Sequence, residues 1–394
     1  MVDTSTAIPI SARMQAVQTP IIPVVGDLVR SNPGTVSLGQ GVVHYGPPDG
    51  VFESMAEILA DPAMHKYQAV EGLPALHDLI RDKLTAFNDI QLDADARIVI
   101  TAGGNMGFMN AVLAIADPGD EVIIQKPYYF NHEMAITIAD CKAVPVDTDE
   151  NYQLDLDAIT DALTPKTRAV VTVSPNNPSG AVYSREALTA VNRLCAENGI
   201  YHISDEAYEY FTYKGAAHFS AGSIDPAASH TISLYSLSKA FGFASWRIGY
   251  MVAPETLFMS IKKIQDTILI CPPVPTQAAA IAAMRAGTAY PQSKLPELSK
   301  VRAIVLGKLD GLGDLCDVPT ALGAFYFMLR LHTNQNDMTL VERLIKEYGV
   351  AVIPGMTFGM DHGCYLRVAY GALDKATAAE GIGRLTRGLH EMCP

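Results

Sequence analysis

Lys239 stands in a setting that does not suit a solvated charge. It lies in the segment Ser236-Leu237-Ser238-Lys239-Ala240-Phe241-Gly242, directly after an apolar, hydroxyl-rich run at 231–235 that is typical of a buried strand. In apolar surroundings a lysine loses stability as an ammonium, so its pKa falls and the amine becomes nucleophilic. Such an amine can hold a carbonyl cofactor as a Schiff base. Arg247 follows on the next predicted strand, and its guanidinium could hold a phosphate of that cofactor.

A pair of glycines supplies a second candidate for phosphate binding. Gly103 and Gly104, followed by Asn105, close one predicted strand and open a helix, so free backbone N–H groups can cradle an anion. The same pair suits tight packing or a dinucleotide site. The dinucleotide fingerprint Gly-x-Gly-x-x-Gly is not matched, however, because Gly103, Gly104 and Gly107 together have the wrong spacing. A single phosphomonoester is the better ligand, with three additional side-chain donors: Ser236, Ser238 and Arg247.

The segment around Lys239 resembles the pyridoxal-phosphate lysine motif of the class I and II aminotransferases, in the aspartate-aminotransferase superfamily of fold type I. The resemblance recurs in order from about Val36 to Gly371, so it covers nearly the whole chain. It implies pyridoxal 5'-phosphate as the cofactor and Lys239 as the catalytic residue that holds it. This cofactor acts as an electron sink, while the protein supplies anchoring, orientation and electrostatics.

The resemblance assigns further residues to the cofactor. Asp205, at the end of a predicted strand, would keep the pyridine nitrogen protonated, and capping of a following helix is its alternative. Tyr208 and Asn177 would both donate to the phenolic oxygen, and Tyr129 would stack on the pyridine face. Both tyrosines could instead be packed core residues. Tyr67 matches a tyrosine that reaches into the phosphate site of a neighbouring subunit, which implies a homodimer with shared active sites.

Arg367 is the candidate for binding the substrate's α-carboxylate. It interrupts an apolar strand, Tyr365-Leu366-Arg367-Val368-Ala369, where a buried guanidinium needs a partner. A structural salt bridge is the alternative. The resemblance adds Gly41 and Asn177 as contacts near the same carboxylate. It also places Asn105 where some aspartate-using relatives carry a lysine, and His44 and Tyr45, which are not fixed cations, at the pocket mouth. A neutral or aromatic amino donor is therefore favoured.

Short apolar runs that alternate with amphipathic ones must position these residues. Alternation of strands and helices predicts a mostly parallel sheet covered on both faces. The predicted strands are 97–101, 121–125, 143–146, 169–173, 201–204, 231–234 and 248–252, and the predicted helices are 105–116, 130–139, 155–163 and 185–198. Residues 51–88 form a helical pattern interrupted at 61–62 and 71–74, and a long helical stretch follows 273–275 to about 309.

The expected fold class is α/β. The large domain has a mostly parallel seven-stranded sheet, and a smaller α/β domain accompanies it, as in the fold-type-I pyridoxal-phosphate-dependent transferases. We predict an N-terminal arm and part of the small domain at 1–45, the large cofactor-binding domain at 46–285 and the C-terminal small domain at 286–394. Scattered prolines in residues 1–35 predict an arm that lies across a surface rather than in a core.

Composition limits the partners and the compartment. The net charge of −13 argues against a nucleic-acid partner, and no apolar run is long enough to span a bilayer. Six cysteines lie far apart without a Cys-x-x-Cys pair, which suits neither a disulfide framework nor a zinc or other metal site. With no basic segment and apolar block at the start of the chain, these features predict a cytoplasmic protein whose partners are small amino acid and 2-oxo acid substrates.

The combined prediction is a pyridoxal-phosphate-dependent aminotransferase that moves an amino group from an α-amino acid to a 2-oxo acid by a ping-pong mechanism. Aspartate aminotransferase and a carbon–sulfur β-lyase remain as alternatives, because the cofactor residues do not separate them. A regulatory domain that binds the cofactor without catalysis would carry a DNA-binding module, which this acidic chain does not suggest. A nicotinamide oxidoreductase is disfavoured by the glycine spacing.

Overall fold

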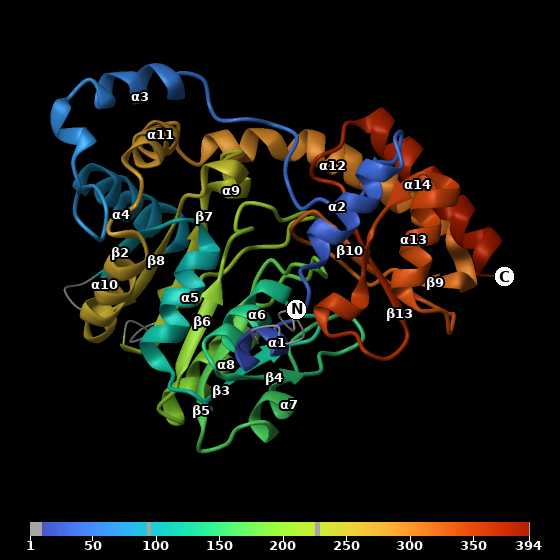
Figure 1. Cartoon of the computed structure of the whole chain (residues 1–394), viewed down its shortest axis with the longest axis horizontal. Coiled ribbons are helices and arrows are strands. Elements are labelled where there is room, and N and C mark those ends of the chain that lie inside the picture. The colour runs from blue at the N-terminus through green and yellow to red at the C-terminus, as the bar shows by residue number, and fades with distance from the viewer. Residues whose placement is uncertain (1–9, 93–95, 225–228, 394) are drawn as a thin grey trace, which may run out of the picture.

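A seven-stranded sheet forms the centre of the chain in the computed structural model, which describes residues 10–92, 96–224 and 229–393 (Figure 1). Its strand order is β2-β8-β7-β6-β5-β3-β4, and only β8 runs antiparallel to its neighbours. The strands are β2 (Ala96–Thr101), β3 (Glu121–Gln125), β4 (Lys142–Val146), β5 (Thr167–Val173), β6 (Tyr201–Asp205), β7 (Thr231–Ser236) and β8 (Gly249–Pro254). Each predicted strand is present, with bounds that differ by at most two residues, so the prediction of a mostly parallel sheet is confirmed.

Helices cover both faces of this sheet, because successive residues of each buried strand point to opposite sides. Val122 and Ile124 pack with the helices of one face, whereas Ile123 packs with those of the other. The first face carries α5 (Gly104–Ile115), α6 (Phe130–Ile138) and α10 (Glu255–Leu269), and the second carries α7 (Leu156–Asp161) and α8 (Arg185–Glu197). Helix α10 is not among the predicted helices, although Leu257, Ile261 and Gln265 are buried at the four-residue spacing of one helix face.

Four more helices flank the sheet on the side of β2 and β8 or lead away from it. They are α3 (Val51–Leu59), α4 (Pro74–Asn88), α11 (Val274–Arg285) and α12 (Ala289–Leu309), with a 3₁₀ turn η1 (Pro62–His65) after α3. The predicted interruptions of residues 51–88 are therefore present. The helical stretch predicted after 273–275 consists of two helices, α11 and α12. Gly287 lies between them with a positive φ of 71°, which ends the first helix.

A second, antiparallel sheet lies in the C-terminal part of the chain, drawn in orange and red in Figure 1. Its order is β12 (Ile353–Pro354), β13 (Cys364–Ala369), β10 (Tyr326–Leu331) and β9 (Cys316–Asp317), and it is accompanied by α13 (Asp337–Tyr348) and α14 (Lys375–Met392). The short strand β1 (Val36–Ser37) pairs with β11 (Val350–Ala351), so an early segment joins this C-terminal part. The exact domain boundaries stay a prediction.

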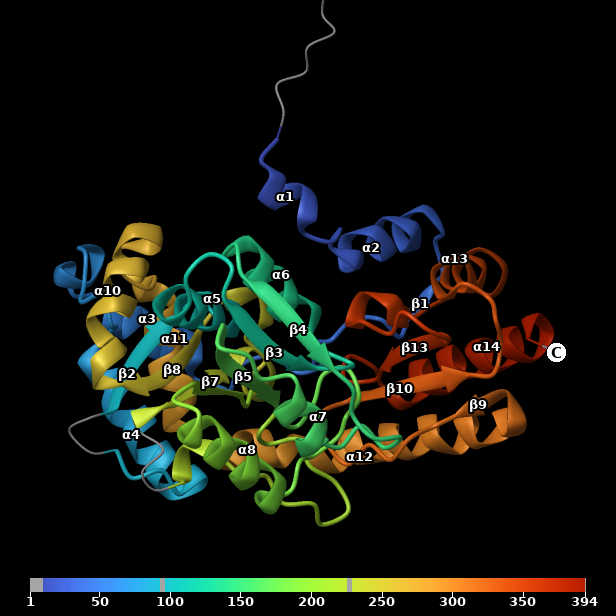
Figure 2. The same ribbon diagram turned by 90° about the horizontal axis from the view of Figure 1, so that it is seen from below.

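The predicted surface arm is partly wrong. Its first nine residues lie outside the described part of the chain, but α1 (Ala12–Ala16) and α2 (Ile21–Ser31) follow, beside α6 and α13 (Figure 2). Val25 of α2 is only 4% exposed, so this helix contributes to the core. Pro20 and Pro23 did not prevent it, because proline is tolerated at a helix start, where its missing N–H has no intrahelical partner. Among the described helices, none is sufficiently long and apolar to cross a membrane.

Candidate active site

A cavity of about 590 Å³ opens where the carboxyl ends of the central strands face the C-terminal sheet. Open α/β sheets bind ligands in this position. All predicted site residues except Gly103 and Tyr67 line it: Gly41, Gly104, Asn105, Tyr129, Asn177, Asp205, Tyr208, Ser236, Ser238, Lys239, Arg247 and Arg367. Segments far apart in sequence thus meet around one space.

Lys239 extends into this cavity from α9 (Leu237–Ala240), a short helix that follows β7 directly. Its Nζ donates a hydrogen bond to the carbonyl of Gly41. Burial lowers the pKa of Lys239 to about 8, and the positive charges of Arg247 and Arg367 contribute to the same shift. At pH 7 roughly a tenth of the amine is therefore unprotonated, and about half is unprotonated at pH 8, so the nucleophilic form is accessible near neutral pH.

The phosphate-binding candidates gather beside Lys239. Gly103 has a φ of +83°, and a Cβ atom built on it would lie 2.3 Å from Nη2 of Arg247, so glycine is required for the guanidinium to approach. Arg247 Nη1 also donates to the Ala244 carbonyl at 2.9 Å and lies 3.4 Å from Oγ of Ser238. Gly104 begins α5, whose first N–H groups face the cavity end of this cluster. Together these groups form a cradle for an anion.

Asp205 ends β6 at another wall of the cavity, where a buried histidine holds it. Oδ2 of Asp205 lies 3.0 Å from Nε2 of His132, and the His132 ring stacks on Phe108 with centroids 3.9 Å apart. Oδ1 accepts a hydrogen bond from the Ala207 N–H at 3.0 Å. Residues 207–210 form a turn, so Asp205 does not cap a following helix. His132 is not among the predicted site residues, because it belongs to no motif and only its place on the buried face of α6 distinguishes it.

Arg367 is a buried cation held by neutral acceptors. Nη1 donates to Oδ1 of Asn177 at 3.0 Å and Nη2 donates to the Gly39 carbonyl at 2.6 Å. Nε has no hydrogen-bond partner, and within the described residues no carboxylate pairs with the guanidinium. Burial lowers the pKa of Arg367. A buried cation without a counter-ion is unfavourable, so the salt-bridge alternative is not met and an anionic ligand would complete the site.

The remaining predicted positions differ in their neighbours. Tyr129 Oη accepts from Asn131 Nδ2 at 2.8 Å and lies 3.4 Å from Oδ1 of Asn105. The Gly41 carbonyl accepts from Lys239, and it is Gly39 that contacts Arg367. The cavity lining includes neither His44 nor Tyr45. The Oη atom of Tyr45 instead donates to the backbone carbonyl of Lys239 at 2.9 Å.

Tyr67 does not enter the cavity of its own chain. Its side chain is 79% exposed and lies in a separate surface hollow with Leu59, Met64 and residues 271–275. A reach into a neighbouring subunit therefore stays a prediction.

Tyr326 on β10 is the second functional candidate that the sequence analysis missed. Its hydroxyl lies 2.7 Å from the hydroxyl of Tyr208, and Asn177 Nδ2 lies 3.5 Å from that same Tyr208 oxygen. The Tyr326 ring faces the Arg367 guanidinium at 4.8 Å. Tyr326 opens an almost continuous apolar run, Tyr326–Leu331, and this pattern does not distinguish it from a core tyrosine.

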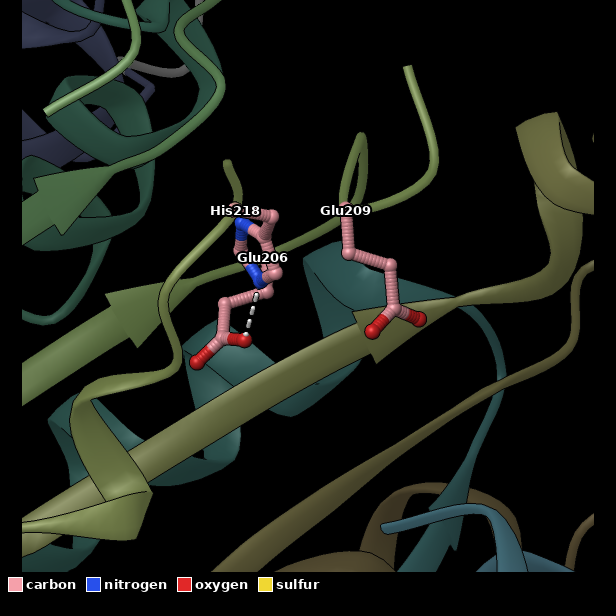
Figure 3. Close-up of side chains that lie close together, drawn as sticks. All are labelled: Glu206, Glu209 and His218. Atoms are coloured by element: carbon pink, nitrogen blue, oxygen red, sulfur yellow. Dashed lines mark hydrogen bonds and ion pairs between the residues drawn. The ribbon is translucent and has the colours of Figure 1, made fainter. Parts of the chain in front are cut away.

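Behind Asp205 and Tyr208 lies a buried ionic network that includes Glu206, Glu209 and His218 (Figure 3). Nε2 of His218 is 2.9 Å from Oε2 of Glu206. Both carboxylate oxygens of Glu209 accept from Nζ of Lys83, at 2.7 and 2.6 Å. Three such side chains can resemble a metal site, but here the ammonium of Lys83 already neutralises Glu209. We therefore interpret the group as an internal ionic network that fixes the loop.

Comparison with known proteins identifies the family. Residues 33–385 match the family model for aminotransferase class I and II. An aromatic aminotransferase of Arabidopsis thaliana is 32% identical over 392 residues, which cover 97% of each chain. An aspartate/prephenate aminotransferase of Thermus thermophilus is 33% identical over 337 residues, 84% of this chain and 86% of the relative.

The architecture also matches solved structures of this family. The crystal structure of an aromatic aminotransferase from Pyrococcus horikoshii superposes with a TM-score of 0.85 at 30% identity, covering 93% of this chain and 99% of that one. An aspartate aminotransferase structure from Thermus thermophilus gives a TM-score of 0.88 at 30% identity, covering 96% and 99%. The chain therefore belongs to the class I and II aminotransferases, and it is a fold-type-I enzyme that transfers amino groups.

Proposed function

We propose that the enzyme uses pyridoxal 5'-phosphate to move the amino group of a neutral or aromatic α-amino acid to a 2-oxo acid in a ping-pong reaction. One observation carries this proposal. A lysine with a pKa lowered to about 8 shares a single cavity with an arginine-and-glycine cradle, a histidine-held aspartate and a buried arginine that lacks a counter-ion. The donor set fits a phosphorylated pyridine with a reactive carbonyl.

The residues would divide the binding of the cofactor among them. Arg247, Gly104, Ser236 and Ser238 would hold the phosphate, and Gly103 leaves room for the guanidinium. The Asp205 carboxylate, oriented by His132, would keep the pyridine nitrogen protonated. When bound, the cofactor supplies an electron sink that makes the substrate's α-hydrogen acidic.

The remaining residues would act on the substrate. Arg367 would hold the α-carboxylate through its unpartnered Nε and its Nη atoms, with Asn177 beside it and Gly39 or Gly41 closing the loop. That hold orients the α-carbon, and orientation is a large part of catalysis. The Lys239 amine, largely uncharged above its lowered pKa, would take the α-proton and return it to the cofactor's reactive carbon.

The walls of the cavity support a neutral or aromatic donor. Ile22, Val42 and Phe130 contribute apolar surface to the lining. The cations in the lining are Lys239, Arg247 and Arg367, each of which has a role at the cofactor or the α-carboxylate. Asn105 supplies no charge for a distal carboxylate. Relatives named as aspartate/prephenate aminotransferase and aspartate aminotransferase keep aspartate as the second candidate donor.

Half-reaction spectra of the purified holoenzyme test this proposal. Phenylalanine or tyrosine should convert the visible band of the cofactor at lower concentrations than aspartate, and a 2-oxo acid should restore it. Borohydride reduction followed by mass spectrometry should find the cofactor on Lys239, and Lys239→Ala should bind it without turnover. A cofactor on another lysine would refute the assignment. Pyruvate with a thiol, formed from a cysteine conjugate in place of the corresponding 2-oxo acid, would favour the β-lyase alternative.

We further propose a homodimer that shares its active sites. The two helices that lead into the hollow around Tyr67 carry exposed apolar side chains: Phe52 on α3, and Ile268 and Ile270 at the end of α10, which are 58%, 57% and 42% exposed. A second copy would cover this surface and receive Tyr67 at its phosphate cradle. The division of each chain at residues 45 and 285, and the cytoplasmic location, stay predictions.

Mixing two inactive or weakened variants tests the shared site. In a mixed dimer of Tyr67→Phe and Lys239→Ala chains, the Tyr67 of the second chain would serve the intact Lys239 of the first, restoring one site with normal cofactor affinity. If each site used its own Tyr67, every functional lysine would keep the substitution. An absence of gain in proven heterodimers would exclude action across the interface.

A further inference from the structure

Tyr326 touches both the cofactor side and the substrate side of the cavity. Its side chain is 1% exposed, its hydroxyl lies 2.7 Å from that of Tyr208, and its ring centre is 4.8 Å from Cζ of Arg367. A Cβ atom on Gly41 would come within 2.3 Å of the Tyr326 hydroxyl, so the glycine loop also closes against this group. Tyr326 belongs to the C-terminal sheet and Tyr208 follows β6, so their contact joins the two parts of the cavity wall.

In the contact between Tyr326 and Tyr208, one hydroxyl donates its proton to the other, and the direction of this hydrogen bond matters for the cavity. Each phenol has one proton to donate, and the Asn177 amide that lies 3.5 Å from the Tyr208 oxygen is itself a donor. Burial raises the pKa of Tyr326 to about 12 and raises the pKa of Tyr208 well above its usual value, so both phenols remain protonated at neutral pH. If Tyr208 donated to Tyr326, it would have no proton left for an acceptor in the cavity. The order Tyr326 to Tyr208 to cavity acceptor satisfies every group.

We propose that Tyr326 is a positioning residue: its hydroxyl donates to Tyr208 and thereby directs the Tyr208 proton at the cofactor's phenolic oxygen, while its ring supports Arg367. This inference rests on the proposed function. Tyr326 would then influence two properties of the site: the acidity of the bound cofactor, through Tyr208, and the placement of the substrate carboxylate, through Arg367. A ring against a guanidinium favours a fixed position of the cation through cation–π attraction.

A pH titration of the visible absorbance of the holoenzyme, without substrate, measures the first role. Loss of a donor to the phenolic oxygen raises the pH midpoint, so Tyr208→Phe should raise it and Tyr326→Phe should raise it by a smaller amount, about half a pH unit. The double variant Tyr208→Phe/Tyr326→Phe should have the same pH midpoint as Tyr208→Phe alone, because Tyr326 acts through the Tyr208 hydroxyl. Tyr152→Phe is the matched control. It removes a buried hydroxyl 3.4 Å from the Met328 carbonyl of β10, outside the cavity lining, and should leave the midpoint unchanged.

Two variants at position 326 test the second role, the support that the Tyr326 ring gives to Arg367. Tyr326→Phe keeps the ring and should leave the KM for the amino acid within about twofold of wild type, whereas Tyr326→Leu should raise it about fivefold. A purely structural role would instead lower the melting temperature of both variants without moving the midpoint.

Two outcomes overturn the inference while leaving the proposed function intact. They are an unshifted midpoint in Tyr326→Phe holoenzyme, or an equal shift with and without the Tyr208 hydroxyl. A wild-type protein that gains no visible band with pyridoxal phosphate overturns the proposed function, and this inference with it.

Discussion

Replacing Lys239 by methionine should stabilise the cofactor-free protein at neutral pH. The lysine has an apolar and cationic environment, and its pKa falls from 10.5 to about 8. Because one pKa unit corresponds to about 1.4 kcal/mol, this fall represents about 3 kcal/mol of unfavourable free energy for the charged form. The substitution also removes the hydrogen bond to the Gly41 carbonyl. This loss should cost about 1 kcal/mol of stability and reduces the gain by that amount. We expect a net gain of about 2 kcal/mol in the free energy of unfolding.

The pH dependence follows from the direction of that shift. Below pH 8 the lysine is protonated in both the folded and unfolded chains, so the full cost is present. Between about 8 and 10.5 the folded protein has released a proton that the unfolded chain still binds, so wild-type stability rises with pH. The advantage of Lys239→Met should therefore shrink across this window and disappear, or reverse slightly, above it.

Urea unfolding of the cofactor-free proteins at one fixed concentration, from pH 6.5 to 10.5, measures the effect. Lys83→Met is the matched control, because Lys83 is also buried but pairs with Glu209. Its replacement leaves a carboxylate buried without a counter-ion and should cost about 3–5 kcal/mol. If Lys239→Met destabilises the protein as Lys83→Met does, or if its gain is independent of pH, the reasoning about an unfavourable catalytic ammonium is wrong.

Three further substitutions test the cavity. Asp205→Ala should lose most turnover while its melting temperature falls only by the equivalent of about 1 kcal/mol; a lowered melting temperature with unchanged turnover would remove Asp205 from the mechanism. Gly103→Ala should weaken pyridoxal phosphate binding at least tenfold in an equilibrium titration, because its Cβ meets Arg247, whereas Gly104→Ala, whose nearest neighbour is 4.0 Å away, should have a smaller effect. Arg367→Lys should raise the KM for the amino donor about 10- to 100-fold, since one ammonium cannot replace the branched set of guanidinium bonds; an unchanged KM would contradict carboxylate binding there.

The sequence predicted the elements whose signal is local. Apart from the edge strand β4, the central strands are short runs of mostly buried residues, and this pattern does not depend on the rest of the fold. Lys239 could be selected because its immediate neighbours already exclude a solvated position. The family assignment and the transferase activity are confirmed by the comparisons, whereas the roles of the individual site residues stay predictions.

The features that the sequence did not predict arise from contacts between distant segments. His132 lies 73 positions before Asp205, and Tyr326 lies 118 positions after Tyr208, so only the folded chain brings each pair together. The scattered prolines predict an arm where the structure has helix α2, because prolines at the start of a helix and in its first turn remove no intrahelical bond. In each case packing rather than local propensity decided the structure.

The loop from Asp205 to Glu209 alternates between two surroundings, with Asp205 and Tyr208 at the cavity and Glu206 and Glu209 in the ionic network behind it. Adjacent residues are thus under two different selective constraints. If Asp205 and Tyr208 bind the cofactor as proposed, they can change only when the chemistry at the cofactor changes. Glu209 can be exchanged whenever Lys83 is exchanged with it, because neutralising both together leaves neither member of this pair as an unpaired buried charge. During divergence of the enzyme, Lys83 and Glu209 should therefore be replaced as a pair, while Asp205 and Tyr208 are retained.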